Sequence, residues 1–276
     1  PPKLLPTTLR WMRLDEVNGL TFADPQQQAA VVACLGEIET GTIPRLRVPW
    51  ALPGWQANTE QWIRSQLYQL GNPAIGPLEQ IKIWFLSCVL RLPTARGYVY
   101  FKVTNASALM VNEASATQAL AKLFPNYIPE PLSIEAKLGW MLLADFGKPV
   151  GWEAPVEVRV AVLREFARLQ IASAAKIEEL LANGCIDRRL PKLAEQIDPL
   201  FADTQMMAYV TPETQRRLLQ AAPKLKELCA QLDYYQVPNT LVHGDLNMNN
   251  VARRSEIDLL HETERTIFFD WTDACL

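Results

Sequence analysis

Apolar residues first recur at helical spacing after residue 24. Asp24 followed by Pro25 is typical of a helix N-terminus, because an aspartate caps free backbone N–H groups and proline suits the first helical position. Residues 41–54 hold three prolines and two glycines, so we expect a linker there and a domain boundary near residue 50. Residues 55–70 then predict a second helix, whose apolar face is formed by Trp55, Trp62, Ile63, Leu67 and Leu70.

An alternation with a period of two residues takes over at residues 78–104. This stretch is rich in β-branched and aromatic side chains and predicts three antiparallel strands, with a turn at 95–97 between the last two. In the third strand, one face carries Tyr98, Tyr100 and Lys102, and the opposite face carries Val99, Phe101 and Val103.

A helical period returns at residues 108–124, with Glu113 in the first half of the expected helix. An extended segment at 128–137 follows, and a turn then leads to a short buried strand that ends at Asp145. The expected sheet therefore has about five strands.

The second half of the chain has mainly helical periodicity. We expect one helix at 156–184, ended by Gly184, and another at 211–232. A small antiparallel sheet followed by helices indicates an α+β protein.

Composition and charge limit the possible size of the core and the classes of binding partner. With 276 residues and 49% hydrophobic content, the chain can bury a large core in one long domain or in two lobes. A net charge of -3 provides no broad basic field, which argues against nucleic acid or an anionic membrane surface as a partner. The longest apolar stretch, at 83–90, is far shorter than the roughly 20 residues that a membrane helix needs.

The five cysteines are far apart and lack the paired short spacing of a zinc site, so we expect reduced thiols in a cytoplasmic protein. The N-terminal stretch has no initiator Met and no apolar segment after its charged residues. It does not have the pattern of a secretory signal, and we expect a fragment at this end.

Polar residues follow short apolar runs near the end of the sequence. Residues 241–250 read LVHGDLNMNN, and residues 267–276 read IFFDWTDACL. The chain has a His-Gly-Asp triplet at 243–245, followed by Asn250 and later by Asp270. With its small sheet and helical second half, it resembles the aminoglycoside phosphotransferase and choline kinase-like family. The likeness extends from about Pro53 to the end of the chain.

This resemblance implies a two-lobed protein-kinase-like fold. Residues 51–145 would form an N-lobe with a small antiparallel sheet, and residues 146–276 a mainly helical C-lobe. Residues 1–50 would be an extension or the tail of an upstream domain. Because several helices normally follow the second Asp motif in this family and supply acceptor specificity, we expect the C-lobe to be truncated and part of the substrate pocket to be missing.

The resemblance also assigns the chemistry, which is transfer of the γ-phosphate of ATP to a hydroxyl of a small molecule such as an amino sugar or amino alcohol. Asn250 and Asp270 would hold Mg²⁺, a hard cation that prefers oxygen ligands. Asp245 would orient the acceptor hydroxyl and take its proton. Lys102 would contact the α- and β-phosphates, held by an ion pair with Glu113.

The resemblance also implies roles for residues in the rest of the nucleotide site. Residues 145–147, beginning with Asp145, would form the hinge whose backbone faces adenine. The turn between the first two strands has no glycine, unlike the phosphate-covering loop of protein kinases, so we expect Ser87 to offer its hydroxyl and backbone N–H to phosphate. His243 is expected to order its loop, and Asp273 either caps a helix or touches the metal shell.

Two other function classes stay open. A nucleotide-binding regulatory module with the same fold would bind ATP without useful turnover, although all the expected catalytic residues are present. An aspartate-based phosphohydrolase is a weaker alternative, because it would need a D-x-D nucleophile early in an α/β chain, and here the spacing is D-x-x-D near the end.

Overall fold

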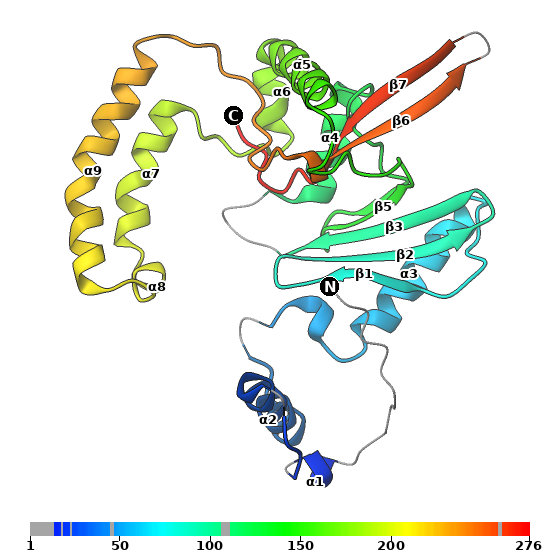
Figure 1. Ribbon diagram of the computed structural model, residues 1–276. Helices are drawn as coiled ribbons and strands as arrows, with labels where there is room; N and C mark the ends of the chain where they lie inside the picture. Colours follow the sequence, from blue (N-terminus) through cyan, green and yellow to red (C-terminus); the bar gives the residue numbers. More distant parts are fainter. Residues whose placement is uncertain (1–13, 18, 23, 45–46, 106–110, 259–260) are drawn as a thin grey trace. The chain divides into compact units, whose positions relative to one another are not determined.

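The computed structural model describes residues 14–17, 19–22, 24–44, 47–105, 111–258 and 261–276 (Figure 1). It divides into two compact units, Pro1–Trp55 and Gln56–Leu276.

The first unit contains the described helices α1 (Leu14–Val17) and α2 (Pro25–Thr40) and the 3-10 helix η1 (Pro49–Ala51). The helix start predicted at Asp24 is confirmed, since the Asp24 side chain accepts a hydrogen bond of 2.8 Å from the Gln26 backbone N–H.

The second unit contains a five-stranded sheet in the order β1-β2-β3-β5-β4, with every pair antiparallel. The predicted strands and the turn at 95–97 are confirmed; Gly97 has a φ of 107°, which favours glycine. The strands are β1 (Glu79–Ile83), β2 (Ser87–Thr94), β3 (Gly97–Thr104), β4 (Ser133–Glu135) and β5 (Trp140–Ala144).

One face of this sheet packs against helix α3 (Trp55–Gln69). The ring of Trp62 lies 6.1 Å from that of Phe101 and 5.4 Å from that of Trp140, in edge-to-face contacts. Val99, Phe101 and Val103 are all buried, so the alternation predicted for β3 is confirmed. Within the predicted apolar stripe of α3, however, Leu70 is exposed.

Helix α4 (Glu113–Leu123) packs on the opposite face of the sheet, where Ala114 contacts Met141 and Leu143. Met141 pairs with Lys102 across β5 and β3, so α4 lies on the face that carries the lysine. The helix begins later than the periodicity predicted, because the Asn112 side chain caps it by accepting a hydrogen bond from the Ser115 N–H. The expected helix was predicted to begin at residue 108, and residues 106–110 lie outside the described residues.

The helical part differs from the prediction in two ways. The single helix expected at 156–184 is divided by a 3-10 turn, and two helices between residues 190 and 207 were not predicted. The helix expected at 211–232 is confirmed. The elements are α5 (Val156–Ser173), η2 (Ala174–Lys176), α6 (Ile177–Ala182), α7 (Leu190–Ala202), α8 (Thr204–Met207) and α9 (Pro212–Asp233), with α7 beside α9.

None of the helices in the described part of the chain is long and apolar enough to cross a membrane.

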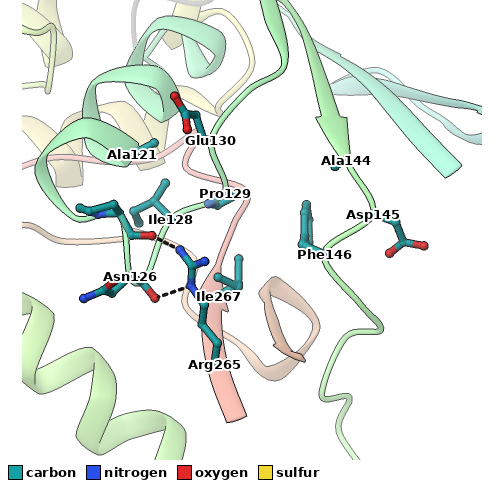
Figure 2. Close-up of a pocket in the computed structure, with 11 residues that line it drawn as sticks. Ala121, Asn126, Ile128, Pro129, Glu130, Ala144, Asp145, Phe146, Arg265 and Ile267 are labelled. Atoms are coloured by element: carbon teal, nitrogen blue, oxygen red, sulfur yellow. Dashed lines mark hydrogen bonds between the residues drawn. The ribbon is translucent and has the colours of Figure 1, made fainter. Parts of the chain in front are cut away.

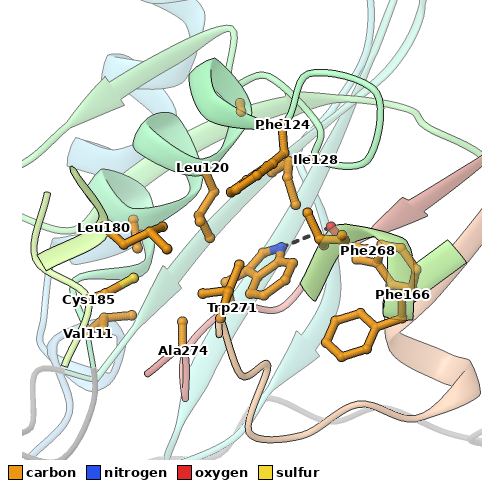
Figure 3. Packing of buried hydrophobic residues seen from close by; sticks show 14 of the residues in the cluster. Val111, Leu120, Phe124, Ile128, Phe166, Leu180, Cys185, Phe268, Trp271 and Ala274 are labelled. Carbon is orange, nitrogen blue, oxygen red and sulfur yellow. Dashed lines mark hydrogen bonds between the residues drawn. The ribbon is translucent and has the colours of Figure 1, made fainter. Parts of the chain in front are cut away.

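The 3-10 turn η3 (Met248–Asn250) leads into a hairpin of β6 (Val251–Asp258) and β7 (His261–Phe268). The residues that follow this hairpin belong to a hydrophobic core, and Trp271 is fully buried at the centre of that core (Figure 3). The Trp271 indole donates a hydrogen bond of 3.0 Å to the Phe268 carbonyl, and Leu120 and Phe124 bring α4 into the same cluster. The core therefore fixes both α4 and the segment that carries Asp270.

Candidate active site

Lys102 lies between two carboxylates that come from distant parts of the chain. Its Nζ is 2.7 Å from Oε1 of Glu113 and 2.6 Å from Oδ1 of Asp270. Glu113 is the first residue of α4, and Asp270 follows β7. The ion pair predicted between Lys102 and Glu113 is therefore present, and the sequence did not reveal the direct contact with Asp270.

Burial and charge act in opposite directions in this triad. Burial disfavours the charged lysine, but the carboxylates of Glu113 and Asp270 outweigh it and raise the pKa of Lys102. Burial raises the pKa of Glu113, because its side chain is only 2% exposed and Lys102 compensates incompletely. Burial also acts on Asp270, but the attraction of Lys102 and the hydrogen bonds from Lys102 and Thr272 lower its pKa. Asp270 is thus the carboxylate better suited to remain charged.

Thr272 joins the same cluster and was not predicted. Its hydroxyl lies 2.9 Å from Oδ1 of Asp270 and 3.3 Å from Oε2 of Glu113. Its carbonyl accepts a hydrogen bond of 3.1 Å from the Val111 N–H, just before α4. Hydrogen bonds of Thr272 therefore link the start of α4 to the segment after Asp270.

The loop at 245–250 is held by side-chain amides around Asp245. The Asn250 amide nitrogen lies 2.9 Å from the Asp245 carbonyl oxygen and 3.1 Å from Oδ2 of Asp245. Asn247 donates to the same carbonyl and to Oδ1, both at 3.2 Å. Asp245 is exposed, whereas Asn250 is buried. The two amides orient an accessible carboxylate, and Asn247 is a contact that sequence reasoning missed.

His243 connects this loop to the segment before Asp270. Its Nε2 lies 3.0 Å from the Phe269 carbonyl oxygen, and its ring is 4.4 Å from that of Trp271. Because a carbonyl only accepts, Nε2 must carry the proton and donate, which leaves Nδ1 without a proton in the neutral ring. Nδ1 is buried and has no hydrogen-bond partner among the described residues. Burial accordingly lowers the pKa of His243, although Phe269 and the nearby Asp270 and Asp245 oppose this effect.

Gly244 allows the loop to approach the second motif closely. Its φ is 83°, and a Cβ built there would lie 2.4 Å from Cβ of Asp273 and 2.6 Å from the Asp273 carbonyl oxygen. The Phe269 N–H also donates to the Asn250 carbonyl at 3.0 Å. Asp270 itself has a φ of 67°, an uncommon conformation that Asp and Asn tolerate better than most residues. The two motifs are therefore joined through their backbones.

Ser87 and Asp145 lie at two other places on the sheet. Ser87 is the first residue of β2, and its Oγ accepts a hydrogen bond of 2.6 Å from Nε1 of Trp84. Asp145 follows β5 and is exposed, and its Oδ1 accepts from the Gly147 N–H at 2.9 Å. Phosphate binding at Ser87 and adenine binding at 145–147 stay predictions.

A cavity of about 410 Å³ lies beside the end of β5 (Figure 2). Arg265 from β7 borders it, and its guanidinium donates to the backbone oxygens of Pro125 and Asn126. The cavity contains none of the triad residues in its lining, so cavity size alone would not locate the charged cluster. The lining residues are Ala121, Pro125, Asn126, Ile128, Pro129, Glu130, Ala144, Asp145, Phe146, Arg265 and Ile267.

Comparison with known families decides the class of the protein. The model of the phosphotransferase enzyme family matches residues 87–276, which is more than half of the chain. The chain belongs to this family. No curated protein sequence matches it.

Solved structures of other phosphotransferases are similar to the chain at low sequence identity. Choline kinase LicA from Streptococcus pneumoniae has 11% identity and a TM-score of 0.50, over 79% of this chain and 70% of that chain. Macrolide 2'-phosphotransferase type I has 19% identity and a TM-score of 0.48, over 79% and 72%. Ethanolamine kinase from Plasmodium vivax has 11% identity and a TM-score of 0.47, over 95% and 72%. The expected two-lobed, protein-kinase-like α+β fold is thus confirmed.

Asn250 and Asp270 each keep one side-chain oxygen of the kind that Mg²⁺ prefers as a ligand. The Asn250 amide nitrogen is directed to Asp245, so its oxygen is the atom that remains for a ligand. Asp270 uses Oδ1 for Lys102 and Thr272, which leaves Oδ2. No group of three or more His, Cys, Asp or Glu side chains in the described part of the chain could hold a metal. Mg²⁺ commonly uses one or two protein oxygens together with substrate phosphates and water.

Proposed function

We propose that the protein is an ATP- and Mg²⁺-dependent phosphotransferase that transfers the γ-phosphate to a hydroxyl of a small molecule. The observation that carries this proposal is the placement of Lys102 between Glu113 and Asp270, beside the loop of Asp245 and Asn250. Phosphoryl transfer depends mainly on positioning and on charge stabilisation, and these residues provide both.

In this proposal Lys102 holds the α- and β-phosphates, and Glu113 keeps its ammonium group in place. Asn250 and Asp270 would hold Mg²⁺, which would offset the negative charge of the phosphates during transfer. Because Lys102 contacts Asp270, the proposed phosphate-binding cation and the proposed metal ligand are adjacent before nucleotide binds.

Asp245 acts on the acceptor. Its carboxylate is exposed and oriented by Asn250 and Asn247, so it is accessible to a hydroxyl from solvent. It would accept the hydroxyl proton as the acceptor oxygen attacks the γ-phosphorus and ADP leaves with the bridging oxygen. An amino sugar or amino alcohol is the acceptor class we favour.

All five cysteines are free thiols, and reduced cysteines agree with the cytoplasmic location that we propose.

Calorimetry with ATP tests the nucleotide part of the proposal. We expect Mg²⁺ to strengthen ATP binding, and Asp270→Asn to remove most of that gain. Asn is the suitable replacement because it tolerates the positive φ at this position. The matched control is Asp233→Asn at the C-terminal end of α9, which should bind like the parent. ATP affinity that is the same with and without Mg²⁺ would contradict the proposal.

A screen of amino sugars, amino alcohols and small sugars with Mg-ATP tests the transfer itself, with mass spectrometry to detect a phosphorylated acceptor. If ATP binds and no acceptor is phosphorylated across the screen, the regulatory module becomes the better account. The absence of glycine from the β1–β2 turn is the observation that keeps this second candidate in view, because the phosphate cover must then work differently.

A further inference from the structure

The turn between β1 and β2 is built from large side chains. No glycine occurs between Gly76 and Gly97, and residues 83–86 read IWFL. Trp84 and Ser87 close the turn through a hydrogen bond of 3.1 Å from the Trp84 N–H to the Ser87 carbonyl. A turn without glycine is less able to bring bare backbone against a phosphate, so contacts there must come from side chains.

Lys82 lies next to this turn and shares a face with Lys102. In the register of the sheet, Lys82 pairs with Val89, and Val89 pairs with Lys102. Cross-strand partners point to the same face, and adjacent strands are about 4.8 Å apart, so the two lysines stand about 10 Å apart on one row. A lysine side chain extends roughly 6 Å from its Cα, by the bond lengths of its four-carbon stem. Both ammonium groups can therefore reach one triphosphate.

The ammonium group of Lys82 lies against an aromatic ring. Its Nζ lies 4.3 Å from the centroid of the Trp84 ring, a cation–π contact, and Nε1 of Trp84 is fixed by Oγ of Ser87 at 2.6 Å. The Lys82 side chain is exposed, and its only interaction with the described residues is this ring contact. Arg91 on the same face is ion-paired with Glu79. Within the described part of the chain, no neighbouring carboxylate therefore neutralises the charge of Lys82.

The charge balance of the site calls for such a cation. Lys102 is neutralised by two carboxylates, and the exposed Asp245 adds a third. Together with the two charges of Mg²⁺, the Lys102 ammonium only balances these three carboxylates, so the cluster has no net positive charge with which to attract a polyanionic triphosphate. An additional positive charge on the sheet side would offset repulsion of the β- and γ-phosphates.

We infer that Lys82 is a second phosphate-binding cation of the nucleotide site, positioned by Trp84 and Ser87 in place of a glycine-rich cover. This inference rests on the proposed function, because it assigns a further residue to the same ATP site. Lys82 contacts the outer phosphates, so it contributes to binding ATP and ADP but not AMP.

Binding of ATP, ADP and AMP to Lys82→Gln, measured by calorimetry in the presence of Mg²⁺, tests this assignment. We expect ATP affinity to fall about tenfold, ADP affinity to fall less, and AMP affinity to stay unchanged, since a charge-assisted contact to phosphate is lost. Lys82→Arg should retain most of the affinity for ATP. The matched control is Lys137→Gln, which makes the same charge change at an exposed turn beside β4, the other edge strand.

Three outcomes would overturn the inference. If the parent binds Mg-ATP and Lys82→Gln binds it equally well, Lys82 is not a phosphate ligand, and the proposed function is unaffected. If Lys137→Gln weakens ATP binding as much as Lys82→Gln, the effect is one of net charge rather than of a contact. If the parent does not bind Mg-ATP, the proposed function and this inference fail together.

Discussion

The ammonium of Lys102 lies 2.6 Å from Oδ1 of Asp270, although the two residues are 168 positions apart in the sequence. On its other side the same group contacts Glu113, whose side chain is only 2% exposed. A buried carboxylate without a cation is strongly destabilising, so the lysine supports the fold as well as the site.

Replacing Lys102 by methionine should lower the free energy of unfolding by about 3–5 kcal/mol, because Glu113 is then left buried without its partner. Adding Glu113→Gln should recover much of that loss, since the amide carries no charge. Chemical denaturation of the two single variants and the double variant measures this coupling. Lys122→Gln, an exposed lysine in the last turn of α4, should change stability by no more than about 0.5 kcal/mol. Equal stability of Lys102→Met with and without Glu113→Gln would show that the pair is not coupled.

Asp245→Asn should lower the rate of phosphoryl transfer by about 10² to 10⁴, once an acceptor is known, because the amide cannot accept the hydroxyl proton. Mg-ATP affinity should stay nearly constant, since the role proposed for Asp245 lies in the transition state rather than in nucleotide binding. Steady-state kinetics combined with nucleotide titration separates the two quantities. A variant that turns over as fast as the parent would exclude Asp245 as the base.

Gly244→Ala should destabilise the protein by at least about 2 kcal/mol, since it combines a positive φ with a contact of 2.4 Å to Asp273. Gly184→Ala is a matched control, because Gly184 has a φ of 91° and nothing within 4 Å of the added Cβ. The control should show only the backbone cost, about 1–2 kcal/mol. Thermal or urea unfolding compares them, and equal losses would mean that the approach of Asp273 is unimportant.

The burial of His243 predicts a pH dependence of stability. Its pKa is lowered from the ordinary value of 6.5, because burial disfavours the charged ring. Below that pH the unfolded chain binds a proton that the folded protein resists, so the free energy of unfolding falls as the pH falls from about 6.5. The slope from this one group is at most about 1.4 kcal/mol per pH unit. Denaturation between pH 5 and 8 should show a weaker dependence in His243→Gln, and an unchanged slope would assign the effect elsewhere.

The sequence predicted the sheet well because its strands have strong local patterns. Val99, Phe101 and Val103 alternate with polar or amphipathic residues, so one face was bound to be buried. The break between α5 and α6 was not visible, because a 3-10 turn at 174–176 keeps apolar residues near helical spacing. Helix α7 contains Pro199, which weakens a helical prediction. Strand β6 includes RRSEID, whose mixture of charged residues gives no strand alternation.

The site was predicted in part for a different reason. Lys102, Glu113, Asp245, Asn250 and Asp270 follow from the family likeness, and the structure brings them into two connected groups. Thr272 and Asn247 were missed because a hydroxyl or an amide carries no spacing rule of its own. Their contacts depend on where the backbone places Asp270 and Asp245, and that placement is set by packing over long sequence distances.

The burial of Trp271 predicts how the site behaves when the protein is heated. The residue that follows Asp270 is fully buried in the main hydrophobic core, whereas many ligand-binding loops belong to parts of a protein that open before the rest. Asp270 cannot move far from Lys102 unless that core opens. The nucleotide half of the site should therefore stay assembled on heating until the second unit melts as a whole, so that loss of ATP binding and loss of fold share one transition temperature.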